Sequence, residues 1–433
     1  MNRTLCLLKL LTLLFLLLAS PFAQAQFVWI TNADNTITIT GYTNSTTWVD
    51  LDIPDTITGL PVTAIGEYAF ASLINVIGVT IPEGVTTIGN NAFQSCYYLT
   101  SIAIPNSVID IEDSAFENCV SLTNLIVPDS VKSIGPAVFW GCYSLPSMKI
   151  PDGVKNLGDY AFYLDGDLTN VTIPNSVTNI GDFAFWSCTS LVNFIIPTGV
   201  TSIGNRAFDS CTSLTSINIP DNVTNFGYNA FSGCTALTNV IIPDSIAIIP
   251  SAIFEGCSSL SQIVIPTNIT EIGGDAFAGC IGLTNITVPA SVINIDGYAF
   301  WDCVNLAEIY FMGNAPNVGD PNAATFYGDT NVTAYYLPGT TGWDNFATNA
   351  DIPIAPWLPA MQSVGSSFDA PTNQFGFNIS WASGQTVFVD ASTNLSNPNW
   401  QPVQTNTLTS GTAFFSDPNS AKYPARFYRL RSQ

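Results

Sequence analysis

A repeat of 23 residues runs through most of the chain and constrains its fold more than any other feature. Phenylalanine recurs at this interval, and a proline and a glycine recur at two other phases of the same period. A fixed period of roughly 20–50 residues is typical of repeat proteins, in which one unit cannot bury its apolar side and must stack on its neighbours. The sequence therefore predicts a solenoid. The phenylalanines are Phe70, Phe93, Phe116, Phe139, Phe162, Phe185, Phe208, Phe231, Phe254, Phe277 and Phe300.

The unit Ala207–Asn229 shows how one coil is built. Its alternation places Ile217 and Ile219 on the same face of a short strand, toward a core. Pro220 ends the strand because proline has no N–H to donate to a neighbouring strand. Gly227 permits a tight corner at which a side chain would be costly. Stacked coils of this kind pair their strands in parallel, and at about 4.8 Å per strand eleven coils make a rod roughly 50 Å long.

The repeat phrase I-x-I-P-x-x-V-x-x-I-G-x-x-A-F-x-x-C-x-x-L resembles the BspA-like class of bacterial leucine-rich repeats over residues 63–312. Residues 26–62 resemble the N-terminal cap of that family, and residues 313–360 resemble its C-terminal cap with a linker. The predicted fold class is mainly β, a leucine-rich repeat solenoid of 23-residue coils with a parallel sheet. The resemblance implies a secreted or surface-exposed protein that binds other proteins or surfaces, and it does not imply an enzyme.

Residues 1–25 are typical of a secretory signal peptide. Basic residues precede the apolar run Leu10–Leu18, and Ala23–Ala25 forms a small-x-small cleavage site. We expect cleavage before Gln26 and export to the cell surface or beyond, with an uncleaved anchor as the alternative. No later segment supplies the roughly 20 apolar residues of a membrane-spanning helix, so no membrane span is expected after cleavage.

The mature chain is strongly acidic and has no histidine. Eight basic and 32 acidic residues give it a formal charge of −24, which makes nucleic acid and anionic membranes poor partners. The absence of histidine excludes a Ser-His-Asp triad, a Cys-His pair and histidine-ligated metal sites. We expect no metal and no cofactor, and a glycosidase that uses only Asp and Glu is the enzymatic alternative.

Half of the basic residues of the mature chain lie in its last twelve positions, at Lys422, Arg426, Arg429 and Arg431.

Nine cysteines of the mature chain share one phase of the repeat, and Asp165 takes that position between Cys142 and Cys188. Their number is odd, and stacked residues have parallel side chains whereas a disulfide needs converging ones. We therefore expect a column of buried free thiols; a metal-binding thiolate row is the alternative, although it lacks C-x-x-C spacing. A carboxylate in this column is expected to accept backbone hydrogen bonds or to reach water. The nine are Cys96, Cys119, Cys142, Cys188, Cys211, Cys234, Cys257, Cys280 and Cys303.

Aromatic residues gather in three consecutive coils near the middle of the repeat. At about one strand spacing from each other, their rings would form an apolar platform suited to a sugar ring or to a side chain of a protein partner. The alternative is that the rings pack over the corner between coils and only seal it. The candidate binding residues are Trp140, Tyr143, Tyr160, Tyr163, Phe183 and Trp186.

Residues 361–433 lack the repeat. Phe375, Phe377 and Ile379 alternate with polar residues, which predicts a half-buried strand, and further strand patterns predict a small antiparallel β-sandwich-like domain. The C-terminal segment 425–430 resembles the end of a small module of secreted bacterial proteins. Adhesion or sorting is one role open to this domain, and a structural cap is the other.

Together these features predict an exported, non-enzymatic scaffold that binds a protein or a glycan outside the cell. The alternative is an architectural role, in which the rod is a spacer that presents the C-terminal domain.

Overall fold

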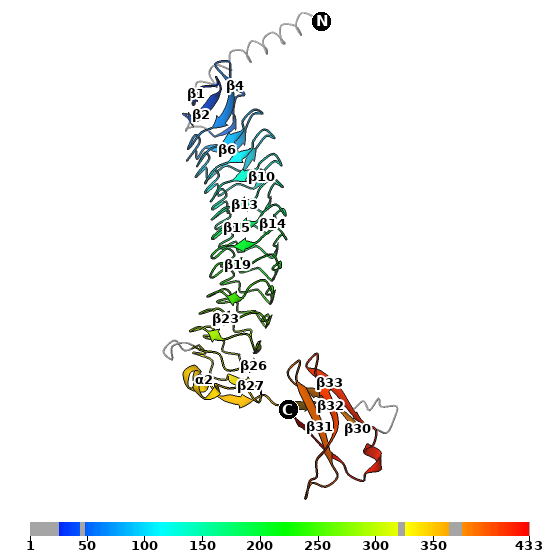
Figure 1. Ribbon diagram of the computed structural model, residues 1–433. Helices are drawn as coiled ribbons and strands as arrows, with labels where there is room; N and C mark the ends of the chain where they lie inside the picture. Colours follow the sequence, from blue (N-terminus) through cyan, green and yellow to red (C-terminus); the bar gives the residue numbers. More distant parts are fainter. Residues whose placement is uncertain (1–25, 44–47, 319–324, 363–374, 433) are drawn as a thin grey trace, which may run out of the picture.

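The protein is a long solenoid with a small β domain at its C-terminal end (Figure 1). The computed structural model describes residues 26–43, 48–318, 325–362 and 375–432. The solenoid and the antiparallel C-terminal domain confirm the predicted fold class. The expected signal peptide, residues 1–25, lies outside the described residues.

Each central coil contributes two short strands, which pair in parallel with equivalent strands of adjacent coils. In these ladders each residue lies opposite the residue one repeat away, as Ile217 lies opposite Val240. Ile217 and Ile219 are both buried, as their alternation predicts. The three-residue strands are β8 (Ser101–Ala103), β10 (Asn124–Ile126), β12 (Ser147–Lys149), β14 (Asn170–Thr172), β16 (Asn193–Ile195), β18 (Ser216–Asn218), β20 (Asn239–Ile241) and β22 (Gln262–Val264). The two-residue strands are β7 (Thr87–Ile88), β9 (Asp110–Ile111), β11 (Ser133–Ile134), β13 (Asn156–Leu157), β15 (Asn179–Ile180), β17 (Ser202–Ile203), β19 (Asn225–Phe226), β21 (Ile248–Ile249), β23 (Glu271–Ile272) and β25 (Asn294–Ile295).

The repeat phenylalanines form one continuous stack inside the solenoid. All eleven are fully buried, and neighbouring ring centroids are 5.2–6.1 Å apart. A twelfth ring, Phe326, continues the stack 5.4 Å from Phe300. Its spacing along the chain departs from the repeat, so the periodicity alone does not reveal it. Each ring thus shields the next, and the core runs unbroken into the C-terminal cap.

The corner that carries each phenylalanine is held by backbone hydrogen bonds between coils. The amides of Tyr160 and Phe162 donate to the carbonyls of Asp182 and Ala184, both at 2.8 Å. In each coil, the residues two positions before and two positions after the phenylalanine have positive φ. Around Phe162 these are Tyr160 (58°) and Leu164 (66°). This conformation aims alternate amides, those of Tyr160, Phe162 and Leu164, at the next coil, so coils are joined here without β-strands.

The cysteine column confirms the prediction of buried free thiols. All nine described cysteines are buried and unpaired by disulfides. Each Sγ–H donates to the carbonyl of the phenylalanine in the preceding coil, at 3.0–3.3 Å. Burial raises the pKa of the thiols, to about 12 for Cys96 and Cys257, so they are neutral at physiological pH.

Asp165 departs from expectation. It lies beside the backbone of Gly141 and Cys142, yet it is fully buried and neither carboxylate oxygen makes a hydrogen bond or reaches water. The expectation of one or the other was wrong, because the coil leaves no space for solvent at this corner. Burial raises the pKa of Asp165 well above its ordinary value, an effect that the nearby amides only partly offset.

Both ends of the solenoid are covered by irregular coils. At the N-terminus, Phe27 and Tyr42 place their rings within 6.4 Å and 6.3 Å of Phe70 and close the ring stack. The N-terminal strands are β1 (Phe27–Thr31), β2 (Ile37–Tyr42), β3 (Val49–Asp52), β4 (Thr56–Ile57), β5 (Leu60–Ile65) and β6 (Val76–Thr80). The C-terminal elements of the solenoid are β24 (Asn285–Val288), β26 (Glu308–Phe311), β27 (Thr333–Tyr336), helix α2 (Trp343–Ala350) and β28 (Ile354–Pro356).

The C-terminal domain contains two antiparallel three-stranded sheets around a small core. Phe377, Ile379, Val387 and Val389 are buried between them. The Trp381 indole donates to the carbonyl of Trp357 at 2.7 Å, and this bond joins the domain to the end of the solenoid. One sheet contains β29 (Ala360–Gln362), β30 (Phe375–Ser380) and β33 (Thr412–Asp417); the other contains β32 (Gln401–Thr407), β31 (Thr386–Ser392) and β34 (Phe427–Arg431).

Candidate binding surface

Five aromatic side chains from three consecutive coils meet at the phenylalanine corner, and we call them the aromatic platform. Tyr163 is stacked on Trp186 at 4.6 Å, and Tyr160 is stacked on Phe183 at 5.0 Å with 5° between the ring planes. Trp140 contacts both tyrosines, at 5.5 Å and 4.9 Å. Four of the five rings contact at least two others, and Trp186 contacts Tyr163, so the rings form a continuous surface with little freedom to rearrange. The platform consists of Trp140, Tyr160, Tyr163, Phe183 and Trp186.

The sixth predicted residue, Tyr143, is placed apart from the platform. It is 43% exposed and makes no ring contact with the platform residues, all of which the structure describes. The five platform rings are each half-buried. They cover the corner as the sealing alternative requires, and they also leave apolar surface accessible to a ligand.

Two columns of the repeat supply the platform. Trp140, Tyr163 and Trp186 each follow a core phenylalanine, so backbone stacking places them one above another. Tyr160 and Phe183 occupy the first positive-φ position of their coils, with φ of 58° and 55°. Bulky residues rarely adopt this conformation, which costs about 1–2 kcal/mol for a non-glycine residue. Sequence reasoning found these residues but not their strained backbone, because tyrosine and phenylalanine carry no signal for it.

Polar side chains border the platform at both ends. The residue after the core phenylalanine is Glu117 in the preceding coil and Asp209 in the following one. Arg206 pairs with Asp209 at 3.2 Å, and its guanidinium lies 6.0 Å from the Phe183 ring. Burial raises the pKa of Tyr163, and Tyr160 and Asp209 add to the effect, so the phenol is neutral at physiological pH. The platform therefore offers apolar ring faces with hydrogen-bonding groups at its edges.

A smaller aromatic pair occupies the same two column positions as Tyr160 and Tyr163, six coils nearer the C-terminus. Tyr298 and Trp301 contact at 6.1 Å, and both are 39% exposed. Sequence reasoning missed this pair, although the column positions that define the platform would have found it.

The outer face of the three-residue strands is a second accessible surface. Four apolar side chains on it are 62–81% exposed: Ile126, Ile195, Ile241 and Val264. A hollow of about 670 Å³ lies beside Ile126, where Lys149 pairs with Asp129 at 2.8 Å. Ile241 and Val264 lie opposite each other on adjacent strands, whereas Ile126 and Ile195 lie on separate coils, so the four do not form one patch.

The repeat region matches a family model described as a BspA type leucine rich repeat region, over residues 63–192 and 178–307. The chain belongs to this family. BspA-type repeats thus account for more than half of the sequence, and the repeat phrase that resembles them is confirmed as such. No curated protein matches the chain.

Several solved bacterial leucine-rich repeat proteins resemble this BspA-type protein. A leucine rich cell surface protein from Faecalibacterium prausnitzii is 33% identical, with 67% of this chain and 94% of that chain covered and a TM-score of 0.44. A leucine-rich repeat protein from Bacteroides ovatus is 27% identical, with 76% and 98% covered and a TM-score of 0.53. The pneumococcal vaccine antigen PcpA is 17% identical, with 76% and 96% covered and a TM-score of 0.51, which shows the shared fold.

The family match makes the protein a leucine-rich repeat scaffold, a class whose members are typically non-enzymatic. In the part of the chain that the structure describes, no helix has the length and apolar character needed to span a bilayer.

Proposed function

We propose that this protein is an exported, non-enzymatic scaffold that binds a glycan or a protein outside the cell through the aromatic platform. The observation that carries the proposal is the contact of five half-buried rings from three consecutive coils. The positive φ of Tyr160 and Phe183 recurs at this position in every coil, so the solenoid backbone itself fixes where these two rings lie.

The platform has the chemistry that recognition of a sugar or of a protein side chain requires. Ring faces attract the C–H surface of a sugar or an apolar side chain, and preorganised rings lose little conformational entropy on binding. Glu117 at one edge can accept hydrogen bonds from hydroxyl or amide groups, whereas Asp209 at the other edge is buried and bonded to Arg206 and Ser210. The signal-peptide pattern of residues 1–25 and the cell surface relative support the extracellular location.

The architectural role remains the second candidate. The continuous phenylalanine core gives an extended rod, and the bond between Trp381 and Trp357 fixes the C-terminal domain at its end. A spacer needs this construction and does not need the aromatic platform.

Binding by variants of the full mature chain separates the two functions. Trp140→Ala and Trp186→Ala should each weaken capture of a glycan-array or pull-down ligand at least tenfold, because removal of a central aromatic anchor costs more than about 1.4 kcal/mol. Trp301→Ala removes a ring from the same column outside the platform and is the matched control. If both platform variants bind every ligand as the parent does, the platform is not the binding site and the architectural role is favoured.

A further inference from the structure

The C-terminal domain differs from the solenoid in charge. Residues 26–360 contain four basic and 29 acidic residues, a formal charge of −25. Residues 361–433 contain four basic and three acidic residues, a charge of +1. The net charge of the rod repels an acidic ligand, whereas that of the C-terminal domain does not.

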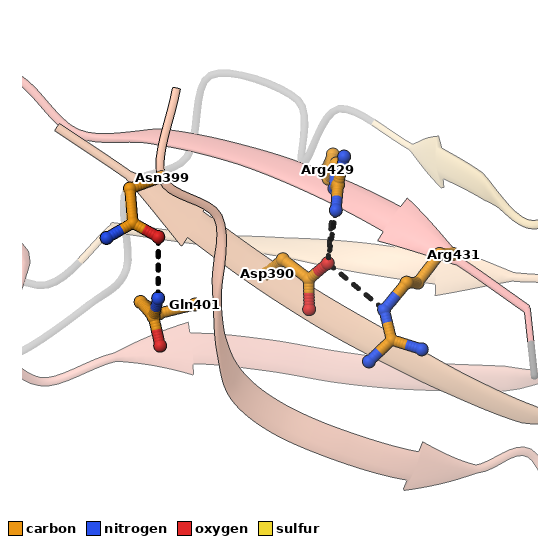
Figure 2. Close-up of polar contacts among 5 residues, drawn as sticks. All are labelled: Asp390, Asn399, Gln401, Arg429 and Arg431. Atoms are coloured by element: carbon orange, nitrogen blue, oxygen red, sulfur yellow. Dashed lines mark hydrogen bonds and ion pairs between the residues drawn. The ribbon is translucent and has the colours of Figure 1, made fainter. Parts of the chain in front are cut away.

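Two of the basic residues are fixed on the outer face of the sheet formed by β32, β31 and β34. Asp390 on β31 is 3% exposed, and its Oδ2 accepts bonds from Nε and Nη2 of Arg429, at 3.1 Å and 3.0 Å. The same oxygen accepts a bond from Nε of Arg431 at 3.1 Å. Figure 2 shows both guanidinium groups directed at this one carboxylate.

These contacts orient the arginines without using up their donors. Arg429 and Arg431 remain 47% and 44% exposed, and both terminal nitrogens of Arg431 are without a hydrogen bond to any described residue. Each guanidinium also lies over a ring, Arg429 at 4.8 Å from Trp400 and Arg431 at 4.2 Å from Phe388. Two positive charges held over one buried negative charge leave the face with an excess positive charge and with N–H groups in a fixed orientation.

An aromatic ring lies next to the arginines. Trp400 is half-buried, and the Arg429 guanidinium lies 4.8 Å from its ring. The Gln401 amide donates to Asn399 at 2.7 Å, but Gln401 lies opposite Ala391 in the ladder and therefore faces the other side of the sheet from Asp390. The ring and the guanidinium groups together match a sugar face and an acid group.

We propose that this face of the C-terminal domain binds an acidic polysaccharide through the carboxylates of its uronic acid units. A guanidinium with two free terminal nitrogens matches the two oxygens of a carboxylate, which a neutral sugar lacks. Asp390 is a positioning residue that holds both arginines ready for the ligand. The site is independent of the aromatic platform, so either can fail without the other.

Titration of tetragalacturonate into the full mature chain tests the proposal. Arg431→Gln should weaken binding about tenfold, and Arg431→Lys, which keeps the charge but loses the fork, should weaken it several-fold. Lys422→Gln removes the same charge from the same domain outside this face and should change binding less than twofold. Thermal unfolding should show that all three variants are folded, since the Arg431 and Lys422 side chains are exposed.

Any one of five results would overturn the proposal, and four of them concern the C-terminal face itself. They are an absence of tetragalacturonate binding, equal weakening by Arg431→Gln and Lys422→Gln, equal binding of the methyl ester of the same oligosaccharide, and displacement of the oligosaccharide by equimolar inorganic phosphate. A loss of binding in Trp140→Ala would assign the saccharide to the aromatic platform and would also overturn it.

Discussion

At the scale of single residues, Asp165 is the residue of the cysteine column whose chemistry differs most from that of a thiol. Nine other coils place a thiol there, which donates to a phenylalanine carbonyl of the preceding coil, as Cys188 does to Phe162. Asp165 is fully buried with no hydrogen-bond partner for either carboxylate oxygen, and burial disfavours the charged form and raises its pKa. The native protein therefore holds a proton on Asp165 that the unfolded chain loses above its ordinary pKa.

This proton gives a pH-dependent prediction for Asp165→Cys. Because the native pKa is raised, the acid destabilises the fold as pH rises above about 4, by about 1.4 kcal/mol per unit up to the native pKa. Asp165→Cys should therefore be more stable than the parent at pH 7, with a smaller difference at pH 4.5. Thermal or urea unfolding at the two pH values measures this difference. Asp165→Asn should lose the same pH dependence, and an unchanged difference between parent and variants at both values would contradict the argument.

At the scale of the coil, glycines determine how closely successive corners approach. A Cβ on Gly181 would lie 2.6 Å from the amide nitrogen of Asp159 and 2.7 Å from the carbonyl carbon of Gly158. Both atoms belong to the backbone of the preceding coil, which cannot move without disturbing the ladder. Glycine is needed here for close approach and not for a positive φ, in agreement with the tight corner predicted from Gly227.

Gly181→Ala should consequently destabilise the protein by about 1–3 kcal/mol, as overpacking against fixed backbone does. Gly166→Ala is the control, because its nearest atom would be the Thr189 hydroxyl oxygen at 3.7 Å. It should change stability by less than about 0.5 kcal/mol. Chemical denaturation of the two variants compares them, and equal effects would show that the corner tolerates a side chain.

At the scale of the whole molecule, the solenoid is a linear array in which each coil contacts its two neighbours. Removal of residues 208–230 deletes one full coil and joins Ala207 to Phe231, which restores the repeat phrase. The remaining rings can stack as before, with Phe231 on Phe185, so we expect a folded and slightly less stable protein.

Removal of only residues 208–219 is the comparison. It shifts every following strand out of register and moves core residues away from the interior, so this variant should aggregate or unfold. Circular dichroism and size-exclusion chromatography distinguish the two outcomes. Retention of the fold by both deletions would mean that the coils are not stacked in the register described here.

The amino-acid sequence by itself determined the features that repeat. The phenylalanine stack, the buried strand residues Ile217 and Ile219 and the free thiol column follow from spacing, because equivalent residues of stacked coils must meet. It also grouped the platform residues, since Trp140, Tyr163 and Trp186 share one column.

Only the tertiary structure decided the features that break the repeat. Phe326 joins the stack despite its irregular spacing, Tyr143 stays apart from the platform, and Asp165 is sealed from solvent. Asp390 meets Arg429 only because β31 pairs with β34 across a long stretch of sequence. The physical reason is that periodicity fixes contacts between equivalent positions, whereas contacts between unlike positions depend on where the backbone turns and on what each turn leaves room for.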